Sequence, residues 1–277
     1  MQAKNQWASR LGFIMATAGA AIGLGNLWKF PYLMGRNGGF PFLIAYLFFI
    51  VILGLPVMMT EMSLGRKTRH DPVQAYADID PHAKIVGIFG VMAAFVILSY
   101  YSVIGGWIIK YIISYGTTLA APADFTMFIS SNEPVIWHFV FMAITTAICF
   151  FGISGIEKAS KFMMPLLFVL LIVIIVRSVT LPGASEGLRF IFSPEGSGFS
   201  LGSVSAALGQ VFYSLSLCMG ITITYGSYLS EKENIPKSCL SVAGLDTAIA
   251  ILAGIAIFPA VFSFQLEPKQ GPGLIFG

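Results

Sequence analysis

Charged residues are scarce in this sequence of 277 residues, of which only 10% are Asp, Glu, Lys or Arg. An ordinary soluble domain has roughly 25%. Hydrophobic residues make up 56% of the chain, and its mean hydropathy is +0.82. A soluble protein of 29.9 kDa would need many more polar groups to cover its outside. The composition therefore excludes a water-soluble globular protein and predicts an exterior covered largely by lipid.

Cysteine pairs, basic patches and catalytic motifs are also missing. The three cysteines, Cys149, Cys218 and Cys239, lie in or beside apolar runs without CxxC spacing, which argues against a disulfide scaffold and a zinc ribbon. The net charge of +3 comes from residues spread between apolar runs, so nucleic-acid binding has no electrostatic footprint. No HExxH or Walker A motif occurs, and the sequence favours a protein that is not an enzyme.

Seven apolar stretches reach the length of about 20 residues that a helix needs to cross about 30 Å of hydrocarbon. They are expected at residues 11–36, 39–64, 85–116, 135–153, 161–181, 202–229 and 239–265. Together they predict an all-α fold with one transmembrane domain over residues 1–277. The first stretch could also be read as a signal peptide, but its apolar character continues to Leu33.

The basic residues between the stretches predict the orientation, because Lys and Arg accumulate on the cytoplasmic side. With the N-terminus inside, ten of them flank inner ends and five flank outer ends, while Lys29 lies within the first stretch. The segment 117–133 has two acidic and no basic residues, as an outer loop would. We therefore expect a cytoplasmic N-terminus and, after seven spans, an outer C-terminus.

The first stretch contains residues that a continuous helix disfavours. Residues 19–26 place three glycines and Asn26 at mid-membrane depth, and each glycine costs roughly 1 kcal/mol relative to alanine in a helix. Close helix packing through Gly19 and Gly23 is the alternative explanation. Lys29 and Pro31 follow closely, however, and they favour a segment surrounded by protein or water.

The sixth stretch is interrupted near its centre in a similar way. The interrupting residues are Gln210, Ser214, Ser216, Cys218, Gly220, Thr222 and Thr224. Hydroxyl groups there can satisfy carbonyls released by a broken helix, although they can also bond back to their own helix. Two interrupted helices five spans apart indicate a binding site near the midplane.

Three polar side chains stand out inside other stretches. Asp246 lies at the centre of the seventh, where an aspartate costs roughly 2.5–3.5 kcal/mol on insertion; its alternative role is a carboxyl bonded to neighbouring serines. Tyr101 lies mid-span rather than at a boundary, where interfacial tyrosines gather. Glu61 lies near an inner span end and could simply snorkel toward the interface.

Several motifs, in order along the whole chain, resemble one known family. They are GLGNLWKFPY at 23–32, NGG at 37–39, EMSLGR at 61–66, YY at 100–101, GIEK at 155–158 and GQVFYSLSL at 209–217. The sequence resembles the neurotransmitter:sodium symporters with the LeuT-type fold, in the bacterial amino-acid transporter branch. That resemblance implies two inverted five-helix repeats with discontinuous helices 1 and 6, usually followed by one or two further spans.

The resemblance implies sodium-coupled symport of an amino acid across a bacterial inner membrane by alternating access. Seven spans would be an N-terminal portion of such a transporter, truncated after span 7. A non-transporting membrane fragment with a structural or regulatory role is therefore the alternative. DNA continuing in frame after the codon for Gly277 would distinguish the two. The implied partners are the amino acid and the lipid bilayer; a homodimer in the complete form is left open.

The resemblance also implies two sodium sites made of oxygen ligands, which suit a hard cation. The first would use the carbonyl of Ala21, the side chain of Asn26, the carbonyl and hydroxyl of Ser214, and Asp246. The second would use the carbonyls of Gly19 and Ile22, with its remaining ligands in an eighth span. Chloride-independent members carry an acid beside the first site. One frequent position for it is Ala250 here, so Asp246 is expected to supply the charge without chloride.

The implied substrate site lies beside the first sodium. Its expected residues are Ala21, Leu24, Gly25, Ile97, Tyr101, Ile104, Tyr213, Ser214, Ser216 and Met219. The substrate carboxylate would lie near the amides of Leu24 and Gly25 and the hydroxyl of Tyr101. Monoamine carriers have an aspartate at the position of Gly23, so its absence favours an amino acid that brings its own carboxylate.

The resemblance assigns gating and supporting roles to the remaining residues. Lys29 and the lid Tyr213 would belong to an outer gate, and Lys4 and Trp7 to an inner gate whose acidic partner lies in an eighth span. Glu61 would brace the interrupted segments, with Gln210 as a further support.

Overall fold

The structure is a computed structural model that describes residues 7, 9–119, 125–194 and 200–267. Within these ranges the regular elements are helices, with no strand. Helices that are long and apolar enough to cross a membrane cover Phe40–Thr68, Pro81–Thr118, Glu133–Phe150, Gly152–Val179 and Ile235–Ser263. A sixth candidate is the bent pair Arg10–Ala21 and Gly25–Arg36. The described chain therefore has the helices of a multi-pass membrane protein, and the expected all-α fold is confirmed.

Two of these spans are built from more than one helical piece. Phe40–Thr68 consists of α3 (Phe40–Phe49), a π-helical turn (Ile50–Gly54) and α4 (Leu55–Thr68). The span Pro81–Thr118 consists of a 3₁₀ turn (Pro81–Ala83) followed by α6 (Lys84–Thr118). The other three are single helices, α8 (Glu133–Phe150), α9 (Gly152–Val179) and α13 (Ile235–Ser263).

The first expected span is broken where the glycines and Asn26 predict a break. α1 (Arg10–Ala21) ends at Ile22, whose extended backbone has ψ 106°. A π-helical turn (Gly25–Lys29) then leads into α2 (Phe30–Arg36), which begins with Pro31 near its first position. Proline suits a helix start because it lacks the N–H that would be unsatisfied there. The two halves of the span differ in direction by 50°.

The sixth expected span, 202–229, is not a continuous helix. α11 (Leu201–Ser214) and α12 (Ile221–Gly226) are too short to cross a membrane singly. The six residues between them include Ser216, Cys218 and Gly220 with φ of 54°, 60° and 74°. Only glycine adopts this left-handed region without strain. The discontinuity expected in helices 1 and 6 is therefore confirmed. Among the described residues, five helices, or six with the bent pair, are long and apolar enough to cross a membrane, and the two short helices α11 and α12 occupy the expected sixth span. The count of seven spans stays a prediction.

The fifth expected span begins earlier than the sequence predicts. Its helix, α9, starts at Gly152 rather than at residue 161. Residues 154–160, which separate the fourth and fifth expected spans, are part of this helix, and Lys161 Nζ lies 2.6 Å from Glu157 Oε1, one turn away. Residues four apart face each other on a helix, and such a pair of opposite charges stabilises the helix by roughly 0.2–0.5 kcal/mol.

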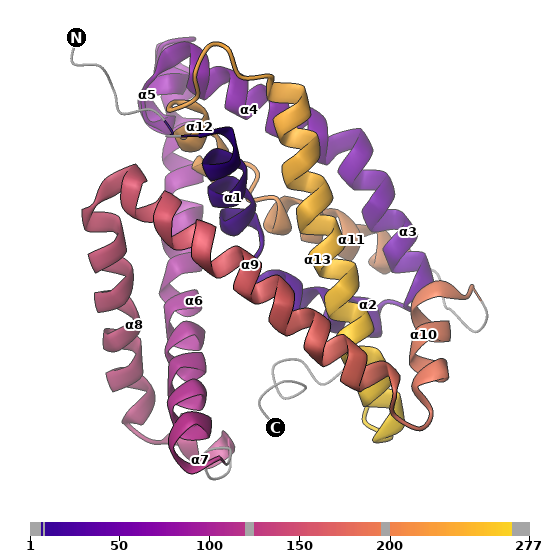
Figure 1. The fold of residues 1–277 in the computed structure, drawn as a ribbon. Coiled ribbons are helices and arrows are strands. Elements are labelled where there is room, and N and C mark those ends of the chain that lie inside the picture. The colour runs from indigo at the N-terminus through magenta and orange to yellow at the C-terminus, as the bar shows by residue number, and fades with distance from the viewer. Residues whose placement is uncertain (1–6, 8, 120–124, 195–199, 268–277) are drawn as a thin grey trace.

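Three short helices lie between the spans. They are α5 (Pro72–Ala77), α7 (Phe125–Ser130) and α10 (Ala184–Phe192). α5 lies at the opposite end of the bundle from α7 and α10 (Figure 1). This arrangement agrees with spans that alternate in direction.

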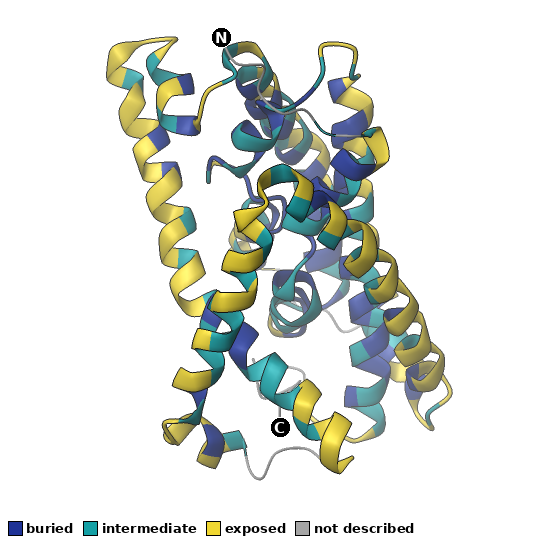
Figure 2. Cartoon of the chain, turned by 60° about the vertical axis from the view of Figure 1, so that its left-hand side comes forward, coloured by how far each residue is buried: buried dark blue, intermediate teal, exposed yellow. Residues whose placement is uncertain are grey.

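The buried centre of the bundle is formed by the broken elements and α13. α9 crosses both α1 and α13, while α6 and α8 pair beside them (Figure 1). Large exposed apolar side chains are concentrated on α6, α8 and α9, and the buried residues gather toward the centre (Figure 2). An exterior of this kind fits hydrocarbon rather than water.

α4 and α12 approach each other closely through two glycines. A Cβ built on Gly65 would lie 1.9 Å from the carbonyl oxygen of Ile223, and one built on Gly226 would lie 2.5 Å from that of Met62. Both obstacles are backbone atoms, which side-chain movement cannot relieve. The glycines therefore allow these two helices to pack backbone against backbone.

Candidate functional site

A fully buried carboxylate, that of Asp246 in α13, lies where both broken spans meet. Asn26 Nδ2 donates to its Oδ1 at 2.7 Å, and Ser214 Oγ donates to its Oδ2 at 2.8 Å. Tyr46 of α3 donates from its hydroxyl to Oδ2 at 3.2 Å. Asn26 Nδ2 also donates to the backbone oxygen of Asp246 at 3.1 Å. Three segments distant from α13 in sequence thus converge on one side chain.

All of these donors are neutral. Asp246 has no exposed surface, and no Lys or Arg in the described ranges forms a salt bridge with it. A buried charge without a partner of opposite sign is strongly unfavourable. The centre therefore has the electrostatics of a cation site.

The available ligand atoms fit a hard monovalent cation. Asn26, Ser214 and Asp246 supply side-chain oxygens, and Ala21 ends α1, where helix carbonyls have no intrahelical partner. Oxygen donors of this kind suit sodium rather than soft metals. No cluster of three His, Cys, Asp or Glu side chains occurs in the described part of the chain. Three of the four residues expected at the first sodium site, Asn26, Ser214 and Asp246, thus meet at one carboxylate, and the fourth, Ala21, is the last residue of α1.

The expected second sodium ligands lie at the end of α1. Ile22 donates its N–H to the Ala18 carbonyl at 2.6 Å and ends the helical hydrogen bonding. Gly19 belongs to the same last turn and faces Ser160 and Met164 of α9. Their carbonyls belong to a helix end that can offer acceptors to an ion.

A cavity of about 270 Å³ lies between α1, α6 and the sixth-span break. Its lining consists of Gly19, Ala20, Ala21, Gly23, Gly25, Ala94, Ile97, Leu98, Tyr101, Tyr213, Ser216, Met219 and Ile221. Seven of the ten expected substrate residues are among them. Leu24, Ile104 and Ser214 do not line it. The volume is close to the lower end of the roughly 300–1,000 Å³ typical of small-ligand sites.

The polar end of the cavity is formed by the two breaks. The Leu24 amide donates to the Tyr101 hydroxyl at 2.6 Å, and the Ser216 hydroxyl donates to the Ala20 carbonyl at 3.2 Å. A Cβ on Gly23 would lie 2.2 Å from the Tyr101 oxygen. Glycine at this position therefore lets Tyr101 reach the unwound segment.

The expected lid, Tyr213, lies directly against the first break. A Cβ on Gly25 would lie 2.6 Å from Tyr213 Cε1. Lys29 Nζ lies 3.4 Å from the centroid of the Tyr213 ring, within the range of a cation–π interaction. In the described structure, Lys29 thus contacts Tyr213, the residue expected to be the lid.

Glu61 and Gln210 contact the broken segments. Glu61 is 4% exposed; its carboxylate accepts the Cys218 N–H at 3.0 Å and a short hydrogen bond from the Thr222 hydroxyl. It therefore does not snorkel toward the interface. Gln210 Nε2 donates to the Gly25 carbonyl at 3.4 Å.

Of the expected inner-gate residues, Trp7 contacts the short helix α12. Its indole Nε1 donates to the Tyr225 carbonyl at 3.3 Å, and the two rings meet edge to face. Lys4 lies outside the described residues.

Some residues of the site were missed by the sequence analysis. Tyr46, which binds Asp246, sits in an apolar run where a tyrosine at depth was the only available signal. Ala94, Leu98 and Ile221 line the cavity but look like any apolar residue of a span. The sequence also contains a Gly-x-Ser-x-Gly string at 183–187, a pattern typical of a hydrolase nucleophile. Its Ser185 is exposed on α10 and follows no strand, so the required strand–turn–helix context is missing there.

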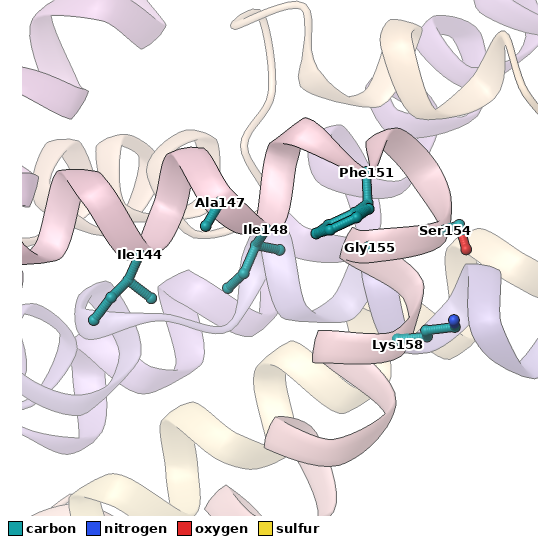
Figure 3. A pocket seen from close by; sticks show the side chains of 7 residues that line it. All are labelled: Ile144, Ala147, Ile148, Phe151, Ser154, Gly155 and Lys158. Atoms are coloured by element: carbon teal, nitrogen blue, oxygen red, sulfur yellow. The ribbon is translucent and has the colours of Figure 1, made fainter.

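A larger hollow of about 580 Å³ lies where α8 turns into α9. Figure 3 shows its mostly apolar side chains, with Ser154 and Lys158 together at one end. Its lining contains no residue of either broken span and does not include Asp246. The smaller cavity between the breaks is therefore the candidate site.

Comparison with known proteins agrees with this geometry. The sequence profile of the sodium:neurotransmitter symporter family matches residues 4–132 and 123–271. The chain belongs to the sodium:neurotransmitter symporter family. It is 42% identical to the sodium-dependent transporter YhdH of Bacillus subtilis over 282 residues, and 38% identical to a sodium-dependent transporter of Haemophilus influenzae over 294. These alignments cover 98% and 99% of this chain.

The same family fold is found in a solved structure. The crystal structure of MhsT in complex with L-phenylalanine matches with a TM-score of 0.92 and 48% identity, covering 99% of this chain and 65% of MhsT. The expected LeuT-type fold is therefore confirmed. The chain spans 62% and 64% of the two bacterial relatives' lengths.

The contact between Gly23 and Tyr101 predicts a specific steric effect. Gly23→Ala should lower the melting temperature of the purified protein, since overpacking commonly costs roughly 1–3 kcal/mol. Removing the opposing oxygen with Tyr101→Phe in the same chain should recover part of that loss. Differential scanning fluorimetry in detergent measures both effects. Gly209→Ala is the matched control, because nothing lies within 4 Å of its added Cβ; equal melting of the Gly23 and Gly209 variants would contradict the geometry.

Proposed function

We propose that the full-length protein is a sodium-coupled symporter that carries an amino acid across the membrane by alternating access. The observation that carries the proposal is the buried Asp246 carboxylate, held only by neutral donors and flanked by a cavity between two broken helices. Membership of the sodium:neurotransmitter symporter family supports it, as do two bacterial relatives named as sodium-dependent transporters.

Ion and substrate are coupled because the same two breaks provide both sites. Asn26 contacts Asp246, while Leu24, two residues earlier, contacts Tyr101 at the cavity. On the other break, Ser214 contacts Asp246 and Ser216 lines the cavity. A cation that fixes Asn26 also restricts Leu24 on the same break. A cation that fixes Ser214 likewise restricts Ser216. Filling one site therefore organises the other, as linkage between two ligands requires.

The substrate is an amino acid with a free carboxylate. The described lining of the cavity includes no acidic side chain, and the Tyr101 hydroxyl, which accepts the Leu24 amide, lies in the wall near Gly23 as a hydrogen-bonding group. The rest of the wall, with Ile97, Leu98 and Met219, suits an apolar side chain. The MhsT structure contains L-phenylalanine, which supports this substrate class.

Chloride is not required, because Asp246 supplies the negative charge beside the sodium. Ala250, one turn further along α13, is buried and apolar. Relatives described as sodium- and chloride-dependent GABA transporters are more distant, at 28% identity for the mouse protein. The carboxylate neutralises the cation directly, so no additional anion is needed at the centre.

The protein lies in a bacterial inner membrane with its N-terminus in the cytoplasm. The distribution of Lys and Arg supports this orientation. The basic end of α4, with Arg66 and Lys67, is followed by α5, and α7 lies at the opposite end of the bundle (Figure 1). α7 is accordingly extracytoplasmic.

The orientation predicts which exposed positions react from outside the cell. In a cysteine-free background, Ser130→Cys in α7 should react with an impermeant maleimide on intact cells. Glu231→Cys, in the connection between α12 and α13, should react only after lysis. Both positions are exposed, so access through the membrane alone distinguishes them. The reverse pattern would refute the proposed orientation.

The carboxylate requirement predicts that a decarboxylated amine is not recognised. In cells producing the full-length protein, 2-phenylethylamine should not compete with uptake of labelled L-phenylalanine, whereas unlabelled L-phenylalanine should. Gly23→Asp should abolish this uptake, because a second negative charge would face the substrate carboxylate. Equal competition by the amine and the amino acid would refute the proposed substrate class.

The proposed ion dependence can be tested by replacing salts. Uptake of L-phenylalanine should be lost when choline replaces sodium and retained when gluconate replaces chloride. Asp246→Asn keeps a ligating oxygen but removes the charge, so it should stop uptake or make it respond to chloride. Asp78→Asn, outside the site, is the control for loss of one carboxylate. A parent protein that loses most uptake in sodium gluconate would contradict the role of Asp246.

A further inference from the structure

Tyr100 of α6 does not line the cavity, yet it contacts a residue that does. Its hydroxyl donates to the hydroxyl of Tyr213, in α11, at 2.9 Å. Tyr213 lines the cavity and lies against the first break at Gly25. Tyr100 is therefore placed to affect the cavity through the lid.

The Tyr213 ring is held on three sides. Gly25 makes room for its edge, since a Cβ there would lie 2.6 Å from Cε1. Lys29 Nζ lies 3.4 Å from its centroid. Tyr100 holds the hydroxyl, which is the end of the ring farthest from its backbone. Of these contacts, only the one with Tyr100 requires a hydroxyl group on the lid.

The next residue, Tyr101, contacts the first break directly. Its hydroxyl accepts the Leu24 amide at 2.6 Å. Successive residues of an α-helix point about 100° apart, because there are 3.6 residues per turn. One pair of adjacent tyrosines on α6 thus reaches both interrupted spans, through Leu24 and through Tyr213.

We infer that Tyr100 is a positioning residue, whose hydrogen bond holds the Tyr213 lid closed and slows exchange between the cavity and the outside. The inference rests on the proposed function, because it assigns a substrate to the cavity. The bond does not touch that substrate. Its loss should therefore speed entry and exit without changing which ligands are accepted.

The test is a double-mutant cycle with Tyr100→Phe, Tyr213→Phe and both together. In full-length protein, dissociation of labelled L-phenylalanine should be roughly threefold to tenfold faster in each single variant, as expected for one hydrogen bond. The double variant should be no faster than either single variant, because all three lose the same bond. Competition by a panel of amino acids should keep its order.

A second readout does not depend on the substrate. In a cysteine-free background, a cysteine replacing Ala94 in the cavity lining should react faster with an impermeant thiol reagent in all three variants. Tyr115→Phe, an exposed tyrosine near the end of α6, is the control and should change neither rate. Melting temperatures of all variants distinguish a moved lid from general loosening of the fold.

The outcomes separate this inference from the proposed function. The parent protein could fail to bind L-phenylalanine with sodium while the variants still show faster cysteine labelling. That result would overturn the proposed function but not the role of Tyr100. Binding by the parent with independent, multiplying effects of the two substitutions would overturn the role of Tyr100. Unchanged rates in both readouts, or faster labelling only in proportion to lowered melting temperature, would also overturn it.

Discussion

The buried carboxylate of Asp246 is the constraint on which the centre of this structure depends. A charge at that depth must be surrounded by donors, and Asn26, Ser214 and Tyr46 supply them from three other segments. Two of those segments are broken spans. The hydrogen bonds of Asp246 therefore bring the two breaks together, and the cavity lies beside their meeting point.

The two breaks solve the problem of unpaired backbone groups in different ways. In the first, the chain is interrupted for only a few residues, and the Leu24 amide is satisfied by Tyr101. In the sixth, residues with positive φ turn the chain, and Glu61 satisfies the Cys218 amide and the Thr222 hydroxyl. In both cases a side chain from a neighbouring span replaces the missing helical hydrogen bond, as the interior of a membrane requires.

Residues that are chemically unusual for a membrane span could be found from the sequence. Asn26, Asp246 and the glycines of residues 19–25 conflict with an apolar helix, and the structure places them at the site. Cavity-lining residues whose role comes only from their position could not be identified from the sequence. Leu98 and Ile221, for example, resemble any lipid-facing residue.

The start of α9 could not be predicted from the sequence for a related reason. Glu157 and Lys161 lie at or before the expected start of the fifth span, and their pairing on one face of α9 depends on helix geometry that a count of apolar residues along the sequence does not include. The positive φ of Ser216 and Cys218 was equally inaccessible, because those residue types rarely adopt it. Such backbone shapes are imposed by tertiary contacts such as the one between Glu61 and Cys218. Local sequence preference does not encode them.

The close approach of Gly65 and Gly226 has a mechanical consequence. Backbone packed on backbone leaves no side chains that could rearrange to fill a gap, so moving α12 away from α4 would leave a void at the two glycines. Any rotation of α12 then needs hinges outside the pair. The chain offers one in residues 215–220, between α11 and α12, and another in the π-helical turn Ile50–Gly54 that precedes α4. A displacement of α12 that kept this contact would therefore have to bend the second span as well as the sixth.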